Sequence, residues 1–147
     1  MEGIVISRIN IQDERYPQVY ELREEILRKP IGLSLKNEDL SADAQNDIFI
    51  AENGGEVIGC VMLYPIADEE KIKLRQMAVH NRWQGQGIGR MLVEAAEAYA
   101  KEKGYASIIL HARQIAEPFY KKLGYYTTSS VFTEVGIPHV VMEKDIF

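Results

Sequence analysis

The alternation of apolar and polar residues along the chain predicts a series of strands and helices. Residues 4–9 are rich in β-branched side chains and bounded by polar residues, which is typical of a strand. From 17 to 29, apolar residues recur at helical spacing, and Pro30 ends the run. The apolar runs 48–51 and 57–63 enclose an Asn-Gly-Gly sequence, which predicts a hairpin of two antiparallel strands.

The second half of the chain continues this pattern around a glycine-rich segment. Residues 71–80 alternate as a strand and complete a three-stranded meander. The remaining predicted elements are a helix, a strand, a helix and two strands, at residues 88–103, 107–112, 115–123, 125–132 and 139–144. This order predicts one α+β, or mixed α/β, domain over residues 1–147, built around a single sheet.

Composition limits the kinds of partner. The chain has 147 residues and a formal net charge of -5, so it has no general attraction for nucleic acid or an anionic membrane. No stretch approaches the roughly 18 apolar residues of a membrane span, and the N-terminus lacks a signal-peptide pattern, which predicts a cytoplasmic protein. Cys60 is the one cysteine, and the three histidines lack metal-ligand spacing, so no metal is expected.

The segment from Arg82 to Arg90 places Gly85, Gly87 and Gly89 between a predicted strand and a predicted helix. Glycine lets backbone N–H groups turn toward a ligand, and a helix N-terminus adds unsatisfied donors and a positive dipole end. A tight turn without a ligand is the alternative, but three glycines before an amphipathic helix favour a phosphate site. The segment lacks the Gly-Lys-Ser/Thr of a P-loop and the spacing of the dinucleotide fingerprint.

The sequence Gln84-x-x-Gly87-x-Gly89 resembles the Q/R-x-x-G-x-G/A signature of the GNAT acyltransferase superfamily. The resemblance implies the GNAT fold, a mostly antiparallel twisted sheet flanked by helices, and acetyl-CoA as cosubstrate. The residues that it implies to hold the coenzyme A pyrophosphate are Gln84, Gly85, Gln86, Gly87, Ile88, Gly89 and Arg90. The preceding strand, through Met77, Ala78 and Val79, is implied to run beside the pantetheine arm.

A second stretch, residues 116–125, resembles the A-x-x-F/L-Y-x-x-x-G-F/Y signature of the same superfamily. The resemblance implies that Tyr120 is the catalytic residue and donates a proton to the departing thiolate. The alternative is that Tyr120 only packs against the cofactor or hydrogen-bonds to it. Arg113 stands where many relatives carry Asn, and it is expected either to bind coenzyme A in another way or to face the acceptor.

Residues 131–142 resemble a pattern of the ElaA and YjcF group within this superfamily. The resemblance makes Glu134 and His139 candidates for acceptor binding or proton removal, against the alternatives of a solvated loop carboxylate and a histidine that caps a strand. A further likeness at residues 22–30 makes Arg23 a candidate for binding an anionic group of the acceptor, although a solvated helix face explains the same charges.

Three functions remain open from the sequence. The first is an N-acetyltransferase in which an amine of a small molecule or peptide attacks the thioester directly. The second is a non-catalytic module that binds acyl-CoA, and the third is a nucleotide-binding domain. A homodimer could form through an edge strand such as Val140-Val141-Met142, which could equally be internal.

Overall fold

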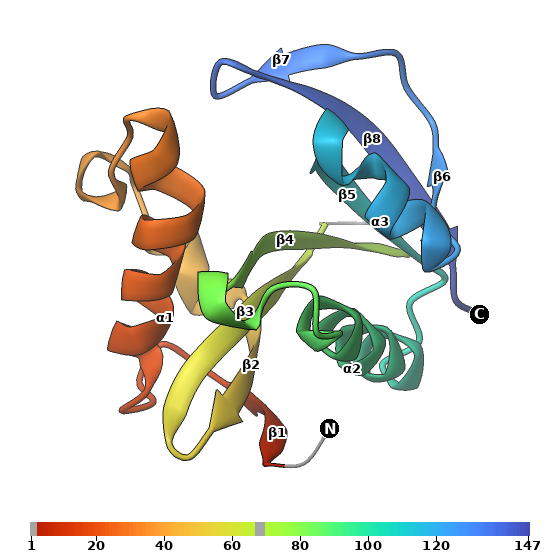
Figure 1. Ribbon diagram of the computed structural model, residues 1–147. Helices are drawn as coiled ribbons and strands as arrows, with labels where there is room; N and C mark the ends of the chain where they lie inside the picture. The colour runs from red at the N-terminus through yellow and green to blue at the C-terminus, as the bar shows by residue number, and fades with distance from the viewer. Residues whose placement is uncertain (1–2, 67–69) are drawn as a thin grey trace.

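An eight-stranded sheet runs through the computed structural model, which describes residues 3–66 and 70–147 (Figure 1). Its strands are β1 (Ile4–Ile9), β2 (Asp47–Asn53), β3 (Glu56–Pro65), β4 (Lys71–Val79), β5 (Ser107–Arg113), β6 (Tyr126–Thr127), β7 (Phe132–Glu134) and β8 (Ile137–Asp145). The strand order is β1-β2-β3-β4-β5-β8-β6, and β7 pairs with β8. The pairing of β4 with β5 is parallel and the other pairings are antiparallel, so the predicted fold class is confirmed.

In the residues that the structure describes, three α-helices and several shorter helical turns accompany the sheet. The α-helices are α1 (Tyr16–Arg23), α2 (Ile88–Glu102) and α3 (Glu117–Lys122). The π-helical segment η1 (Glu24–Arg28) continues α1, and the short 3₁₀ turns are η2 (Lys29–Ile31), η3 (Leu35–Asn37), η4 (Ser41–Gln45), η5 (Asn81–Trp83) and η6 (Gln114–Ala116). None of the helices in the described part of the chain is long and apolar enough to cross a bilayer.

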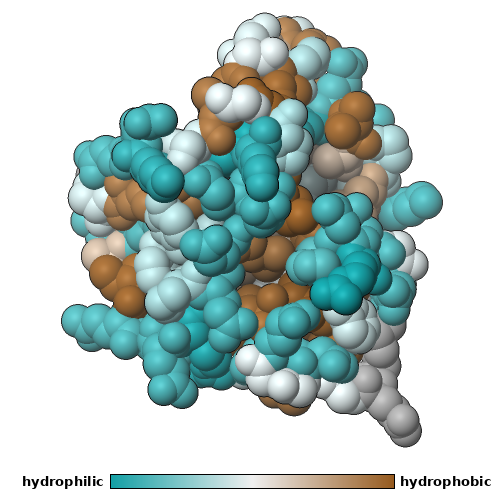
Figure 2. Space-filling view, turned by 60° about the vertical axis from the view of Figure 1, so that its left-hand side comes forward, coloured by the Kyte–Doolittle hydropathy of each residue, from teal (hydrophilic) through white to brown (hydrophobic). Residues whose placement is uncertain are grey.

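The helices lie on opposite faces of the sheet, with α1 on one side and α2 and α3 on the other (Figure 1). Under α1, Val19 and Leu22 pack against apolar residues of β2 and β3. On the opposite face, Leu92 and Ala96 of α2 join Tyr120 of α3 in the larger core. On the face that Figure 2 shows, hydrophilic residues predominate at the surface, and apolar residues appear near the middle, where the surface is hollowed.

The two halves of the sheet separate after a short parallel ladder. β4 pairs with β5 from Lys71, opposite Ser107, to Leu74, opposite Leu110. Beyond this point β5 stays with β8, and its Arg113 pairs with His139. β4 instead bends, because its register with β3 shifts by one residue and Gln76 adopts a φ of 57°. Such a bulge turns a strand away from its neighbour, and here it parts β4 from β5.

Two predicted elements differ in detail from the structure. The helix expected over 17–29 changes from α to π geometry at Glu24, which brings Arg23 and Arg28 to the same partner, Oε1 of Gln76. The strand expected over 125–132 is divided into β6 and β7. It is interrupted where the Ser129 hydroxyl accepts from the Val141 amide and takes the place of a backbone partner.

The segment Val140-Val141-Met142 does not form an edge strand. It lies inside β8, with β5 on one side and β6 and β7 on the other. Its backbone groups are therefore paired within the chain, and the edge that the sequence suggested for a homodimer is absent there. The side chains of Val140 and Met142 are buried in the core.

A buried ion pair anchors the N-terminal helix beneath the sheet. Nη1 of Arg23 donates to Oδ2 of Asp43 over 2.7 Å, and the two side chains are 0% and 3% exposed. The hydroxyl of Tyr16 donates to the same carboxylate oxygen over 2.7 Å. Removing one partner of such a pair leaves a buried charge without compensation, whereas an exposed pair contributes little.

We predict that Arg23→Met lowers the free energy of unfolding by about 3–5 kcal/mol. The matched control is Arg8→Gln, because Arg8 pairs with Asp47 at the surface, where the side chains are 51% and 28% exposed. That variant is expected to lose less than about 1 kcal/mol. Urea denaturation measures both, and equal losses would contradict the buried role of Arg23.

Candidate active site

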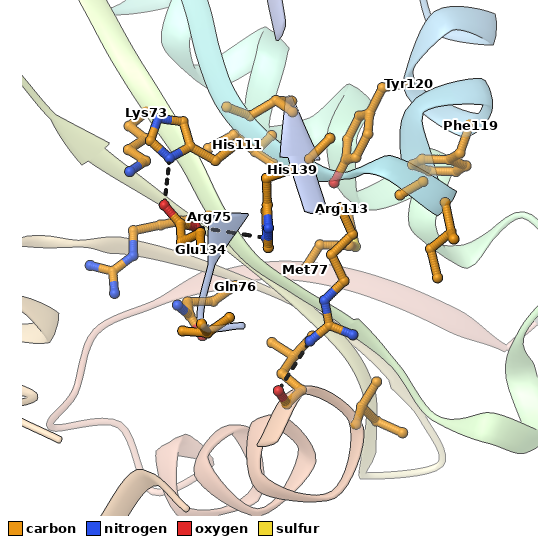
Figure 3. Close-up of a pocket in the computed structure, with 18 of the residues that line it drawn as sticks. Lys73, Arg75, Gln76, Met77, His111, Arg113, Phe119, Tyr120, Glu134 and His139 are labelled. Atoms are coloured by element: carbon orange, nitrogen blue, oxygen red, sulfur yellow. Dashed lines mark hydrogen bonds and ion pairs between the residues drawn. The ribbon is translucent and has the colours of Figure 1, made fainter. Parts of the chain in front are cut away.

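A pocket of about 510 Å³ opens where β4 parts from β5. Its walls come from β4, β5, α3, β8, the turn after β7 and the residues around Arg28 that follow α1. Side chains from these distant segments point toward one another across it (Figure 3). The sheet therefore brings together groups that lie far apart in the sequence.

Tyr120 reaches this pocket from the core side. It lies on α3, is 6% exposed and packs edge-on against Phe119 and Tyr125. Burial raises the pKa of its phenol, so the group keeps its proton at neutral pH. Its hydroxyl has no hydrogen-bond partner among the residues that the structure describes, and it can therefore donate to a ligand in the pocket.

A carboxylate and two imidazoles form the centre of the opposite wall. Oε1 of Glu134 lies 2.8 Å from Nδ1 of His111, and its Oε2 lies 3.7 Å from Nε2 of His139. The ring of Phe132 packs against both imidazoles, with centroids 5.3 Å and 6.0 Å away. Nδ1 of His139 donates to the carbonyl of Ile137 over 2.8 Å, which leaves Nε2 toward Glu134. The arrangement can accept a proton and stabilise the resulting charge.

Burial and hydrogen bonding act on Glu134 in opposite directions. Burial raises the pKa of its carboxyl group, but the hydrogen bond with His111 and the charges of His111, His139 and Lys73 outweigh it. The net effect holds the pKa below its ordinary value, so Glu134 is ionised at neutral pH. A proton taken up by either imidazole would thus face a negative charge.

The turn that carries Glu134 is short and strained. Val135 and Gly136 connect β7 to β8 with φ angles of 47° and 75°, which is the pattern of a type I′ hairpin. A β-branched residue seldom adopts a positive φ. In the described part of the chain Gln76 and Val135 are the non-glycine residues with positive φ, and both line this pocket. Strain of this kind gathers at functional sites.

The glycine loop joins β4 to α2 through η5. Gly85 and Gly87 have φ angles of 76° and 85°, and a Cβ at either position would meet no atom within 4 Å. The backbone conformation therefore disfavours a side chain at either position, while the space beside the loop is open. Gly89 leaves room for another reason, since a Cβ there would lie 3.1 Å from the ring of Phe119, which would have to shift. The first backbone donors of α2 lie next to this open space.

The structure brings together five of the residues that the sequence singled out. Those that line the pocket are Met77, Arg113, Tyr120, Glu134 and His139. The lining does not include Ala78, Val79 or the loop residues 84–90. Ile88 is buried in the core, and Gln84 instead fixes the loop by donating from Nε2 to the carbonyl of Val79 over 3.0 Å.

Arg23 occupies a different place from the expected one. Its side chain is fully buried against Asp43, and its Nε donates to Oε1 of Gln76 over 3.3 Å. Arg23 therefore supports the bulged residue from below and does not face the pocket. The arginine of this segment that does line the pocket is Arg28, which donates to the carboxylate of Glu38.

Sequence reasoning did not find His111, Lys73 and Arg75, which also line the pocket. Strand alternation contained the signal, because His111 lies two residues before Arg113 and must share its face. Lys73 and Arg75 are likewise two apart on β4. Arg113 itself donates from Nη2 to the carbonyl of Leu27 over 3.1 Å and so links β5 to the helix.

A family model described as an acetyltransferase (GNAT) domain matches residues 13–146. The chain therefore belongs to this family, as its glycine loop and tyrosine block predicted. In the residues that the structure describes, no group of three or more His, Cys, Asp or Glu side chains could hold a metal ion.

Curated relatives differ in how much of the chain they match. The uncharacterized protein YyaT of Bacillus subtilis is 42% identical over 74 residues, which are 50% of this chain and 50% of that protein. The chain thus spans about half the length of this relative. The uncharacterized N-acetyltransferase YjcF of Bacillus subtilis is 28% identical over 134 residues, 90% of this chain and 94% of that protein.

Solved structures share the fold. Escherichia coli ElaA has a TM-score of 0.84 at 16% identity, with 96% of this chain and 99% of that chain covered. A GNAT family acetyltransferase from Elizabethkingia anophelis, with acetyl-CoA bound, has a TM-score of 0.74 at 21% identity, with 99% of both chains covered. The GNAT fold and the resemblance to the ElaA and YjcF group are confirmed.

The lowered pKa of Glu134 predicts how its contribution to stability depends on pH. A depressed folded-state pKa gives stability above the unfolded pKa, about 4.3, and this stability is lost as pH falls through the folded value. Because the side chain is 42% exposed, we expect Glu134→Gln to lose less than about 1 kcal/mol at pH 7. The difference from the wild type should vanish at strongly acidic pH.

Chemical denaturation between pH 7 and pH 3 measures this difference. The matched control is His111→Asn, which removes the principal partner and should give a similar loss at pH 7. If the difference between wild type and Glu134→Gln instead grew as the pH fell, folding would raise the pKa of the carboxyl group. Glu134 would then donate a proton in the reaction and not help to accept one.

Proposed function

We propose that this chain is an acetyl-CoA-dependent N-acetyltransferase that transfers the acetyl group to an amine of a small molecule or a peptide. The observation that carries the proposal is the gap between β4 and β5. It lies beside Met77 and Tyr120, and β4 leads from it to a helix N-terminus preceded by two glycines of positive φ. Membership of the acetyltransferase (GNAT) domain family supports the same activity.

The glycine loop is suited to the pyrophosphate of the coenzyme. The amides of residues 85–90 and the positive end of α2 offer donors without a fixed cation. Nothing within 4 Å fills the space where the Cβ atoms of Gly85 and Gly87 would lie. In this proposal the exposed side chain of Arg90 adds a positive charge beside that space.

The unpaired half of β4 is suited to the pantetheine arm. Ala78 and Val79 pair with β3 on one side and Met77 lies in the bulge before them, but the ladder with β5 ends at Leu74. Pantetheine amides can complete such a ladder as an added strand would. An N–H of this strand could then polarise the thioester carbonyl and stabilise the oxyanion of the tetrahedral intermediate.

In the reaction that we propose, the neutral amine attacks the thioester carbonyl carbon. A new C–N bond forms, the C–S bond breaks, and coenzyme A leaves as a thiolate. The excess proton of the amine passes to the imidazole and carboxylate group of His139, His111 and Glu134. An alkylamine is mostly in its ammonium form at neutral pH. A base, or a water next to it, is therefore required to remove the proton.

Tyr120 supports the departure of the thiolate. Its phenol remains protonated and can donate a hydrogen bond to the sulfur as charge develops. Complete transfer of the proton would leave a buried phenolate, which the same burial disfavours. We therefore assign to Tyr120 mainly the stabilisation of the developing charge. The second candidate function is binding of acyl-CoA without catalysis. In that case there is no turnover for this hydroxyl to affect.

We predict that Tyr120→Phe lowers kcat on the order of 10²-fold, the usual effect of removing one donor to developing charge. Affinity for coenzyme A should change less than about threefold, because the loop is untouched. Thiol release and calorimetric titration measure the two quantities. An unchanged rate would remove the catalytic role, and absence of turnover by the wild type over a broad amine panel would favour the binding module.

Alanine at Gly87 tests the phosphate site. Gly87→Ala should lose about 1–2 kcal/mol of stability through its positive φ and also most of the affinity for coenzyme A. Gly54→Ala is the matched control, since Gly54 has a φ of 59° with open space around it in the β2–β3 turn. Gly54→Ala should lose similar stability and keep its affinity for coenzyme A. Thermal shift with coenzyme A measures this, and ATP and NAD in the same assay test the alternative of a nucleotide-binding domain.

A further inference from the structure

The pocket carries more positive charge than the proposed acetyl transfer uses. Among the described residues that line it, Arg28, Lys73, Arg75 and Arg113 are cationic, and Glu134 is the carboxylate. The chain as a whole has a net charge of -5, so this excess is local. A concave surface lined by one sign of charge attracts ligands of the opposite sign.

Two of the four cations have internal partners. Arg28 donates from Nη2 to the carboxylate of Glu38 over 3.0 Å, and Arg113 donates to the carbonyl of Leu27. The side chains of Lys73 and Arg75 make no hydrogen bond or ion pair with any residue that the structure describes. Glu134 interacts with the charge of Lys73, but one carboxylate offsets at most one of these positive charges.

Arg75 is partly buried without such a partner. Burial lowers the pKa of its guanidinium, and the charges of Arg23 and Arg28 add to this effect against the attraction of Asp43. Holding a partly buried cation without a partner is unfavourable, and a bound anion would offset this. A guanidinium matches carboxylate and phosphate oxygens with two parallel hydrogen bonds.

The position of these cations separates them from the coenzyme phosphates. Lys73 and Arg75 precede the bulge at Gln76, whereas the glycine loop follows the far end of β4 at Val79. At about 3.3 Å per residue, the two ends of this strand are well separated. In Figure 3, Lys73 and Arg75 lie on one side of Glu134 and His139, and Tyr120 and Phe119 lie on the other.

We propose that the acceptor carries an anionic group, a carboxylate or a phosphate, a few bonds from its reactive amine, and that Arg75 with Lys73 binds this group. The inference rests on the proposed acetyl transfer and specifies its substrate class. The amine then lies beside Glu134 and His139, between the bound anion and the thioester. Neutral amines and polyamines lack the group that these cations bind.

Pairs of acceptors that differ in one group test this assignment with the full chain and acetyl-CoA. The pairs are β-alanine with β-alaninamide, phenylalanine with phenylalaninamide, and phosphoethanolamine with ethanolamine. The anionic member of at least one pair should have a kcat/KM about 10- to 100-fold above that of its neutral twin, the worth of a hydrogen bond to a charged group. The phosphate and carboxylate pairs distinguish the two anions.

Arg75→Gln should lower kcat/KM for the preferred anionic acceptor about 10- to 100-fold, through KM, and leave the neutral twin within about threefold. Arg75→Lys should restore part of the preference, and Arg8→Gln, a distant surface change of equal charge, should keep it. Neutral twins that match or exceed their anionic partners would overturn the inference while leaving acetyl transfer intact.

If no acceptor is turned over although coenzyme A binds, the proposed activity fails, and binding decides the present inference separately. Calorimetry with the coenzyme A complex should then show that wild type binds the anionic members more tightly than their neutral twins, and that Arg75→Gln loses the difference. Equal binding, or no binding of either member, counts against it.

Discussion

The end of the parallel ladder between β4 and β5 is the constraint on which the site depends. The two strands share pairing as far as Leu74 and Leu110, and the bulge at Gln76 then turns β4 away. A sheet that stayed paired to its end would leave no gap, and Tyr120 would be covered by β4. The same bend leaves the backbone of Met77 to Val79 without a partner on one side and directs β4 toward the glycine loop.

The polar groups under the bend explain why a strained residue is tolerated there. Oε1 of Gln76 accepts from Arg23 and Arg28, and Arg23 is itself held by Asp43. The unfavourable φ of Gln76 is thus supported by hydrogen bonds from the helix that covers this face. Val135 has no comparable support, since it lies at an exposed turn, but the two-residue hairpin requires its conformation. Both strained residues line the pocket.

The fold and the cofactor side follow from local sequence patterns, whereas the acceptor side depends on pairings between distant segments. Hairpin glycines, helical spacing and the loop at 84–90 each act within a short window, so the sequence predicts them well. His111 meets Glu134 only because β5, β7 and β8 become neighbours, and no local pattern indicates this. Arg23 was misjudged because its charge suggested an exposed position, while its partner Asp43 lies 20 residues away in the short 3₁₀ turn η4.

The π-helical segment after α1 has a consequence for how the pocket could change. In η1 the amide of Lys29 donates to the carbonyl of Glu24, five residues back. This hydrogen bond spans one residue more than the corresponding bond of an α-helix, and π-bulges often occur at functional sites. Removing a single residue here would restore an α-helix and rotate Arg28 away from Gln76, with α1 still seated on the core. The number of residues in η1 would then determine which of its side chains face the acceptor. A deletion of one residue there could change the choice of substrate without any substitution in the sheet.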